Sequence, residues 1–592
     1  MEKVFHDIIQ PHQLNLDTDS RTFNRLGYLK IFVFLVAVIC TALLISRGFN
    51  IWLVGLTVLL IVVFVSLWLY HYKVENRINY AKGIIAICNA HIDRITGGWA
   101  SFKDIGAEFI DARHAYSSDL DIVGSKSLFQ YLNTTNTWYG RQAFANDLLH
   151  PNYDIPEIQT RQKAIAELSN DIPFTNDVQY YLSEIGVRES DVQLVEELSN
   201  NQQFTRYKIV KIILTYLPVA TFMLFICGLV FSQNIFYIAG ATLFVLQSII
   251  GRIWQAMPPK KYLGLMGTMP YKLGRFSYVI NMLCQKDFDS EKLNQIKNRL
   301  YEAGTALKAL ERIENKLQVR FNGIIYIVLK VTLLWDYHCA FLLEEWKRKY
   351  APHAETWFKS IGEMESLISF SHLPNVCTNT CTPEPLPNAL SLTAQGLGHP
   401  LLSNDSRINN DISLDNRIFI ISGSNMSGKT TFMRAMGVNI LLARTGSFVC
   451  ASALSCGIFE IMTSMRIADN LNEGVSTFYA ELTRIKRIID VAHKTPNLIF
   501  LIDEIFRGTN SIDRLAGAEA VLSTLDAVGS IGLITTHDLE LCKLATTRPR
   551  IKNHSFSEYY QGNKICFDYK IKAGQSQTTN ARFIMEMVGL KV

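Results

Sequence analysis

Residues 417–430 read RIFIISGSNMSGKT, and the architecture of the C-terminal part of the chain can be inferred from this stretch. The apolar run IFII is typical of a buried strand, and the loop after it has the P-loop spacing of two glycines followed by Lys429 and Thr430. A helical pattern, TFMRAMGVNILLA, follows. Glycines let backbone N–H groups form an anion nest at a helix N-terminus. We therefore expect Lys429 to reach nucleotide phosphates and the Thr430 hydroxyl to bind Mg²⁺.

Two further apolar runs end in polar residues of the kind that a nucleotide site needs. The run LIFLI at 498–502 is continuous, as in a strand buried on both faces of a parallel sheet, and Asp503-Glu504 follows it. Asp503 is expected at the Mg²⁺ position and Glu504 beside the attacking water. The run at 531–534 leads to His537, which can sense a γ-phosphate.

A fourth piece, GVSTF at 474–478, opens a helical pattern with Ser476 and Thr477. Hydroxyl residues at a helix N-terminus suit phosphate binding, and they are equally common as plain helix caps. The spacing does not separate these two interpretations.

Composition indicates a membrane protein. Hydrophobic residues make up 48% of the 592 residues and charged residues 19%, which excludes wholesale disorder. Residues 31–46 and 51–70 carry no charge, and neither do the residues between Lys211 and Arg252, which Ser232-Gln233-Asn234 divides into two halves. Runs of about 20 apolar residues are long enough to span a bilayer. Buried core helices would usually show a polar face, so we expect two transmembrane hairpins.

The basic residues predict the orientation of these hairpins. The outer flanks carry Arg21, Arg25, Lys30, Lys73, Arg77, Arg206, Lys208, Lys211, Arg252, Lys260 and Lys261. The hairpin loops carry only Arg47, so residues 73–211 and 252–592 should face the cytoplasm. The eleven unpatterned cysteines agree with a reduced compartment, and no second pair at zinc spacing accompanies Cys377 and Cys381.

In this order, the C-terminal motifs resemble the MutS family, the ABC-type ATPases of DNA mismatch repair. The similarity starts near His399 with GHPLL and continues through ISGSNMSGKTTFMRAMGVNILLARTGSFVCA, GVSTFYAEL, LIDEIFRGTNSID, ITTHDLE and DYKIKAGQSQTTNARFIMEMVGL. Residues 127–168 and 361–373 are similar to the start and the end of the family's helical lever.

The resemblance implies ATP and Mg²⁺ as cofactors and an ATPase reaction. Asp503 would hold Mg²⁺ together with Thr430, and Glu504 would be the general base, with His537 as the switch histidine and Lys429 as the third catalytic residue. Ser511 and Asp513 would lie at the interface of a homodimer. The residues implied in ATP binding are Gly423, Ser424, Asn425, Met426, Ser427, Gly428, Lys429, Thr430, Thr431 and, from the other subunit, Ser476 and Thr477.

Several features depart from the family pattern. No Phe-x-Glu motif precedes residue 73, so we expect no mismatch-recognition domain, and the connector domain is also missing. The second hairpin falls where the family carries its DNA clamp, and Phe506 stands where the family usually has Gly. The basic stretch 297–320 is expected to be one helix, and its interspersed glutamates favour a solvated mixed-charge face over a DNA-binding face.

The predicted fold is an α/β P-loop ABC-type ATPase domain with a largely parallel sheet, plus an all-α lever region that carries two transmembrane hairpins. The expected segments are a cytoplasmic leader (1–30), hairpin 1 (31–72), the first lever part (73–206), hairpin 2 (207–251), the second lever part (252–384) and the ATPase domain (385–592). We expect a multi-pass protein with four spans in a prokaryotic inner membrane, with the ATPase domain and the lever facing the cytoplasm.

The predicted function is that of a membrane-anchored, MutS-family ATPase in which a dimeric ATP site drives a lever or clamp on duplex or branched DNA. The alternative is a membrane-embedded ATPase that acts on a membrane or protein partner without DNA. The resemblance favours the first hypothesis.

Overall fold

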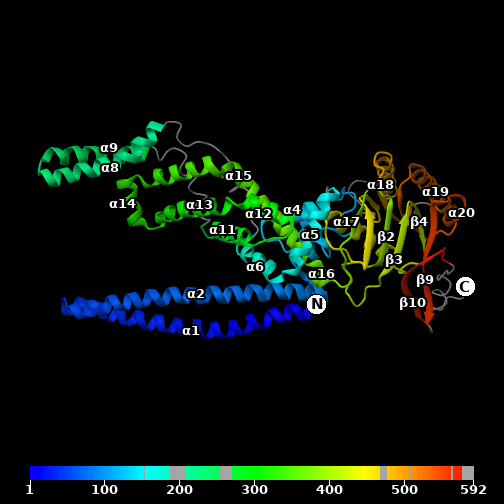
Figure 1. Cartoon of the computed structure of the whole chain (residues 1–592), viewed down its shortest axis with the longest axis horizontal. Coiled ribbons are helices and arrows are strands. Elements are labelled where there is room, and N and C mark those ends of the chain that lie inside the picture. The colour runs from blue at the N-terminus through cyan, green and yellow to red at the C-terminus, as the bar shows by residue number, and fades with distance from the viewer. Residues whose placement is uncertain are drawn as a thin grey trace.

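A computed structural model describes residues 1–151, 154–186, 208–253, 270–387, 389–466, 477–506, 510–561 and 564–576. Figure 1 shows an elongated molecule with an α/β domain at one end, a helical middle region, and two helical hairpins that project side by side from the other end. The apolar parts of both hairpins therefore lie far from the α/β domain.

The first hairpin consists of α1 (Glu2–Arg47) and α2 (Ile51–Thr96), which have 46 residues each. At 1.5 Å per residue each helix is about 69 Å long. The apolar halves are almost fully exposed, whereas Phe5 and Ile84 in the opposite halves are buried in the protein core. The predicted leader at 1–30 is therefore not a separate segment. It continues without a break into the first apolar run and packs its own apolar residues on α2.

The second hairpin consists of α8 (Lys208–Phe231) and α9 (Asn234–Ile253). Within the described residues three helices, α1, α2 and α8, are long and apolar enough to span a membrane. The prediction of four such helices is not supported for α9, whose apolar stretch among the described residues, Asn234–Ile249, is shorter. A fourth candidate is a bent pair, Ile325–Leu333 and Trp335–Val376, with 75° between its parts. The predicted flanking residues Arg206, Lys260 and Lys261 lie outside the described residues.

The middle region is mostly helical in the part that the structure describes, as predicted, with turns and loops over residues 110–127. Its helices are α3 (Leu128–Leu132), α4 (Trp138–Leu149), α5 (Ile155–Asn170), α6 (Ile172–Ser183), α11 (Pro270–Gln285), α12 (Glu291–Leu300), α13 (Ala303–Leu317), α14 (Gly323–Leu333), α15 (Trp335–Ser371) and α16 (Leu373–Val376). Short 3₁₀ helices lie at Gly98–Ser101, Ala107–Phe109 and Gln318–Phe321. The single helix predicted over 297–320 is instead interrupted after Leu300, and both parts pack against α15.

Helix α15 has 37 residues and runs along the helical middle region, from α14 toward the α/β domain (Figure 1). Near its C-terminal end, the buried Glu365 accepts hydrogen bonds from the backbone N–H groups of Asn136 (2.6 Å) and Thr137 (3.2 Å) and from the Thr137 hydroxyl. These groups form the N-terminus of α4, so α15 caps α4 from outside. Burial raises the pKa of Glu365 to about 7. We conclude that α4 and α15 behave as one unit.

The α/β domain contains two sheets, and its first strand, β1, begins at Glu384. The six-stranded sheet has the order β10-β9-β4-β8-β7-β6, and the four-stranded sheet has the order β1-β5-β2-β3. The strands are β1 (Glu384–Leu386), β2 (Ser391–Leu397), β3 (Asn410–Asp415), β4 (Ile418–Ser422), β5 (Ala453–Gly457), β6 (Glu460–Ser464), β7 (Leu498–Asp503), β8 (Ile531–Thr536), β9 (Ile551–Gln561) and β10 (Lys564–Ala573). The helices are α17 (Lys429–Thr445), α18 (Thr477–Ala492), α19 (Ser511–Val528) and α20 (Leu544–Thr547), with a 3₁₀ turn at Leu541–Lys543.

The six-stranded sheet agrees with the prediction of a largely parallel sheet, because only its β9–β10 pair is antiparallel. Strands β4, β7 and β8 are buried on both faces, which explains their continuous apolar sequences. The four-stranded sheet was not predicted, and its β2–β3 and β2–β5 pairs are antiparallel. The domain as a whole therefore has a mixed architecture.

Helix α17, which follows the P-loop, touches the helical region at both ends. Near its start, Arg434 forms an ion pair with Asp121 at 3.1 Å. At its end, Arg161 of α5 donates a hydrogen bond to the Thr445 carbonyl (2.7 Å) and pairs with Asp147 of α4 (2.7 Å). Arg161 and Asp147 are buried, and a buried pair of this kind is costly to break. A displacement of α17 would therefore be transmitted to α4 and α5.

Candidate nucleotide-binding site

The P-loop connects β4 to α17 through a backbone that only glycine tolerates at two positions. Gly423 has φ +152° and Gly428 has φ +104°. A Cβ atom at Gly423 would lie 2.7 Å from the Phe556 carbonyl oxygen, and one at Gly428 would lie 3.0 Å from the Tyr569 ring. The backbone of β9 and the Tyr569 side chain thus approach the loop closely, and a larger residue would displace them.

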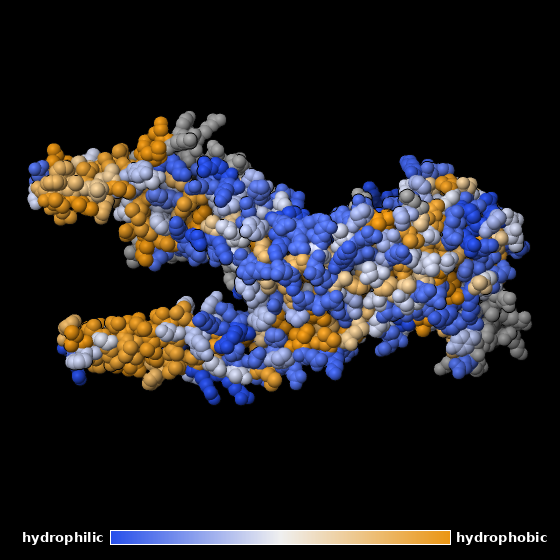
Figure 2. Space-filling model, in the orientation of Figure 1, coloured by the Kyte–Doolittle hydropathy of each residue, from blue (hydrophilic) through white to orange (hydrophobic). Residues whose placement is uncertain are grey.

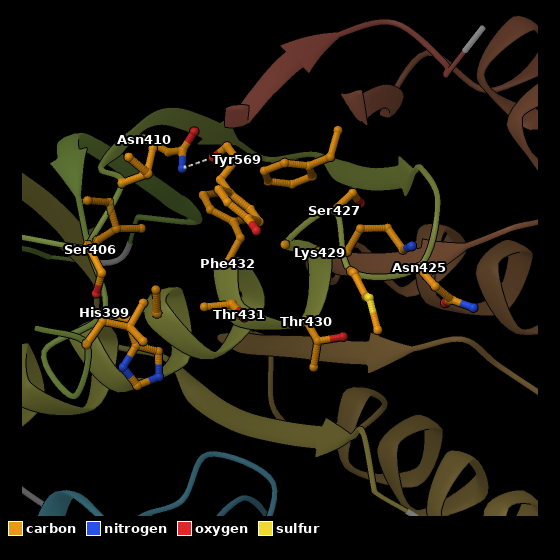
Figure 3. Close-up of a pocket in the computed structure, with 18 of the residues that line it drawn as sticks. His399, Ser406, Asn410, Asn425, Ser427, Lys429, Thr430, Thr431, Phe432 and Tyr569 are labelled. Atoms are coloured by element: carbon orange, nitrogen blue, oxygen red, sulfur yellow. Dashed lines mark hydrogen bonds between the residues drawn. The ribbon is translucent and has the colours of Figure 1, made fainter. Parts of the chain in front are cut away.

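The loop forms one wall of a cavity of about 420 Å³ (Figure 3). The predicted residues Ser424, Asn425, Met426, Ser427, Thr430 and Thr431 all line it. Lys429 Nζ donates to the carbonyls of Gly423 (2.7 Å) and Ser424 (2.8 Å). Ser427 Oγ is buried and has no hydrogen-bond partner among the described residues. The cradle, the buried cation and this unsatisfied hydroxyl fit the phosphates of a nucleotide.

The predicted metal ligands meet at the carboxyl ends of β4 and β7. Thr430 Oγ1 donates to Asp503 Oδ2 at 2.8 Å, and Thr535 Oγ1 of β8 donates to Asp503 Oδ1 at 2.5 Å. Asp503 is therefore oriented by two hydroxyl groups, and it lies directly beside the P-loop helix. A hydroxyl and a carboxylate are oxygen ligands of the kind that Mg²⁺ prefers.

Glu504 and His537, predicted as base and switch, are in direct contact. His537 Nε2 lies 2.6 Å from Glu504 Oε1. Glu504 has a left-handed backbone, with φ +48°, and its N–H donates to Thr535 Oγ1 at 3.0 Å. Left-handed backbones are unfavourable for residues with a side chain, and they occur often at functional sites. This backbone turns the carboxylate toward the cavity, which Glu504 also lines.

The backbone of Phe506 accounts for the family's glycine at that position. Phe506 has φ +61°, in the region where glycine is favoured. Its ring is buried and packs edge-on against Phe478 of α18 at 5.8 Å between ring centroids. Its N–H donates to the carboxylate of Glu481, also in α18. The substitution of glycine by phenylalanine is thus compensated by apolar contact with α18.

The rest of the cavity lining comes from residues to which the sequence analysis assigned no role in the site. They are Leu397, Gly398, His399, Leu402, Ser406, Ile408, Asn410, Phe432, Ala435, Phe556 and Tyr569. Figure 3 shows Tyr569 next to Phe432 beside the loop, and Asn410 Nδ2 donates to the Tyr569 carbonyl at 3.0 Å. Tyr569 is 44% exposed, and it lines the cavity beside Gly428 of the P-loop. No spacing rule connects β10 to the P-loop, because the contact is formed by the sheet order.

The remaining predicted residues are not among the described residues that line this cavity. Ser476 is outside the described residues, and Thr477 begins α18 with its side chain likewise outside them. Ser511 and Asp513 lie in the exposed first turn of α19, where Asp513 N–H donates to the Asn510 cap at 2.9 Å. Their roles in a dimer stay predictions.

Two parts of the chain match known protein families. Residues 419–590 match MutS domain V, and residues 115–218 match MutS domain III. Domain V is an ABC-like ATPase domain, and the matched residues include the P-loop, Asp503, Glu504 and His537.

Three relatives illustrate the similarity, and each is a DNA mismatch repair protein MutS. The protein of Myxococcus xanthus (strain DK1622) is 34% identical over 251 residues, which are 40% of this chain and 28% of that protein. The protein of Geobacillus kaustophilus (strain HTA426) is 27% identical over 351 residues, which are 57% of this chain and 38% of that protein. The protein of Lactobacillus johnsonii (strain CNCM I-12250 / La1 / NCC 533) is 32% identical over 263 residues, which are 43% of this chain and 30% of that protein. The matched part thus spans about a third of each relative.

Proposed function

Because this chain belongs to the MutS family, we propose that it is a membrane-anchored ATPase that hydrolyses ATP in a homodimer and thereby moves its helical lever. The observation that carries the proposal is the convergence of Lys429, Thr430, Asp503, Glu504 and His537 at the carboxyl ends of three neighbouring strands. This is the edge where ligands bind in open α/β sheets.

The residues divide the catalytic work among them. ATP would supply the phosphoryl group and Mg²⁺ would neutralise its charge when both are bound. Lys429 and the loop N–H groups would hold the phosphates, and Thr430 and Asp503 would hold the metal ion. Glu504 would accept the proton of the attacking water, and His537, 2.6 Å away, would orient the carboxylate. Catalysis would therefore rest on positioning and charge stabilisation.

We expect the nucleobase to stack on Tyr569. Tyr569→Ala should weaken ATP affinity about threefold to tenfold, because an aromatic contact contributes about 0.5–1.5 kcal/mol. Tyr569→Phe, which keeps the ring, is the matched control and should bind nearly as the natural chain does. Fluorescence titration with a labelled ATP analogue measures both variants. Equal affinities in all three proteins would contradict the stacking role.

ATP-driven movement would pass from α17 to the lever through the contacts at both of its ends. Arg434–Asp121 and Arg161–Thr445 connect α17 to the helical region, and α15 continues to the far end of the molecule. The proposed dimer would bring the exposed start of α19 of each subunit to the interface. Closing and opening of that interface would then displace the lever ends.

We propose the membrane as the place where the lever acts. Figure 2 shows both hairpins as apolar surfaces that project from a mostly polar body. Exposed apolar surface of this extent is unfavourable in water and is typical of contact with lipid. The Lys and Arg distribution supports cytoplasmic placement of the lever and the ATPase domain.

DNA is the second candidate, and the names of the relatives support it. The basic residues at the start of the stretch 297–320 support it less, because they already have acidic partners. Arg299 contacts Glu363, and Lys297 Nζ lies 3.5 Å from Asp287. A patch that binds DNA needs cations available to neutralise phosphates. We therefore favour the membrane as the site of action.

ATP turnover by the full-length protein in lipid nanodiscs tests the proposal, with matched, mismatched and branched duplexes added at one stated salt concentration. We expect turnover that depends on Lys429 and does not change with DNA. A saturable change with any duplex would contradict the membrane proposal and identify the lever as a DNA clamp. Absence of turnover above the Lys429→Ala blank would contradict the ATPase itself.

A further inference from the structure

Helix α14 is an exposed apolar helix at the end of the lever. It connects the α13 side of the lever to α15, next to the second hairpin (Figure 1). Ile325, Ile327, Val328 and Leu333 are between 42% and 62% exposed. Its polar side chains include Tyr326 and Lys330, which are one turn apart, with Lys330 Nζ 5.4 Å from the Tyr326 ring centroid. A helix that is apolar on most sides is expected in a core or in lipid, and not on a surface in water.

The C-terminal end of α14 is closed by a side chain of the second hairpin. The chain bends by 75° at Leu334, which has φ +50°. The last carbonyls of a helix that ends in this way lack partners within the helix. Gln247 Nε2 of α9 donates to the carbonyls of Val331 and Thr332, both at 2.8 Å. Thr221 of α8 donates to Gln247 Oε1 at 3.1 Å. The buried Gln247 amide thus connects α8, α9 and α14.

The position of Gln247 places this contact at membrane depth. Gln247 lies 13 residues after Asn234, which is next to the hairpin turn, so it is about 20 Å from the turn along α9. The hydrocarbon core of a bilayer is about 30 Å thick. Helix ends in water bond to water, whereas in hydrocarbon every backbone carbonyl needs a partner from the protein. The glutamine supplies such partners.

We propose that α14 is embedded in the cytoplasmic leaflet, where it forms a three-helix membrane unit with α8 and α9 and contacts lipid acyl chains. This inference rests on the proposed function in one respect, the entry of the hairpins into the bilayer. Lys330 would extend its ammonium group to the headgroups. Because α15 begins directly after α14, movement of α15 driven by the ATPase domain would displace a helix that contacts lipid.

Spin labels on the full-length protein in nanodiscs test the proposal. The background carries alanine at the partly exposed cysteines, Cys227, Cys284, Cys381 and Cys566, and must keep the ATPase rate. Single labels are placed at Val328→Cys on α14, at Leu229→Cys on the second hairpin (72% exposed) and at Tyr301→Cys on the lever (77% exposed). Oxygen, which concentrates in lipid, and a water-soluble nickel chelate then report the surroundings of each label.

We expect greater oxygen than nickel accessibility at positions 328 and 229, and the reverse at position 301. If the label at position 328 is more accessible to nickel than to oxygen while the label at 229 is more accessible to oxygen, the placement of α14 is overturned and the hairpins remain in the membrane. Greater nickel than oxygen accessibility at both positions would show that the membrane part of the proposed function has failed. Protection of position 328 from both reagents would indicate a protein occupant, such as a second copy of the chain, and would overturn lipid contact.

Two variants on α9 test the role of the glutamine. Gln247→Leu should shift the label at position 328 toward the nickel-accessible pattern, because α14 loses its two hydrogen bonds to α9. Ser248→Ala is the matched control, since among the described residues the Ser248 hydroxyl bonds within its own helix, to the Phe244 carbonyl at 2.9 Å. The same pattern in both variants would show that Gln247 does not position α14.

Discussion

Lys429→Ala should weaken ATP binding by about two to four orders of magnitude. Lys429 is buried, and its Nζ group lies in the P-loop within 2.8 Å of two loop carbonyls, where a phosphate would replace them as partners. A hydrogen bond to a charged group contributes about 1.5–3 kcal/mol, and the substitution removes at least two of them. Calorimetric titration of the purified full-length protein with ATP and Mg²⁺ measures the loss.

The control for this variant is Lys494→Ala. Lys494 is an exposed lysine that follows α18 in the same domain, so its removal changes the net charge equally. The Lys494→Ala variant should bind ATP with the same affinity as the natural chain. An unchanged affinity in Lys429→Ala would contradict the assignment of residues 423–430 as the phosphate-binding loop.

Glu504→Gln should lower ATP turnover by about two to four orders of magnitude, the usual contribution of a general base, and should leave ATP affinity nearly unchanged. Glutamine keeps the shape of the side chain and a partner for His537, 2.6 Å away, but it does not accept a proton from water at neutral pH. ATP would then persist in the site and hold the proposed dimer closed. Single-turnover hydrolysis and light scattering with ATP measure the two effects.

Glu540→Gln is the matched control for this variant. Glu540 lies three residues after His537, and its exposed carboxylate pairs with Lys543. It should change neither turnover nor oligomeric state. Normal turnover in Glu504→Gln would assign the base to another group. Slow turnover with no ATP-dependent dimer would keep Glu504 as the base and contradict the dimeric site.

The nucleotide site shows how far local sequence carries a prediction. The residues from Gly423 to Thr430, together with Asp503, Glu504 and His537, could be predicted because each follows directly on an apolar strand. The carboxyl ends of parallel strands meet at one edge, so strand position alone brings these groups together. The hairpin helices were predictable for a similar reason, since long uncharged runs have few stable environments other than lipid.

Other features depend on contacts between segments that are distant in the chain. Tyr569 reaches the P-loop because β9 pairs with β4 and β10 pairs with β9, and this sheet order has no local signal. The four-stranded sheet arises from pairings between segments that are far apart in the chain, such as β2 with β5, which are separated by about 60 residues. Glu365 caps α4 across 229 residues for the same reason.

The second hairpin and α14 show both a locally determined feature and one that depends on tertiary packing. Hydropathy identified α8, but it counted α9 as a full span and treated 323–333 as part of a soluble lever. The apolar length of a helix is a local property and can be read from sequence. Which side chain satisfies the carbonyls at a helix end depends on the folded packing, and here this packing brings Gln247 to the end of α14.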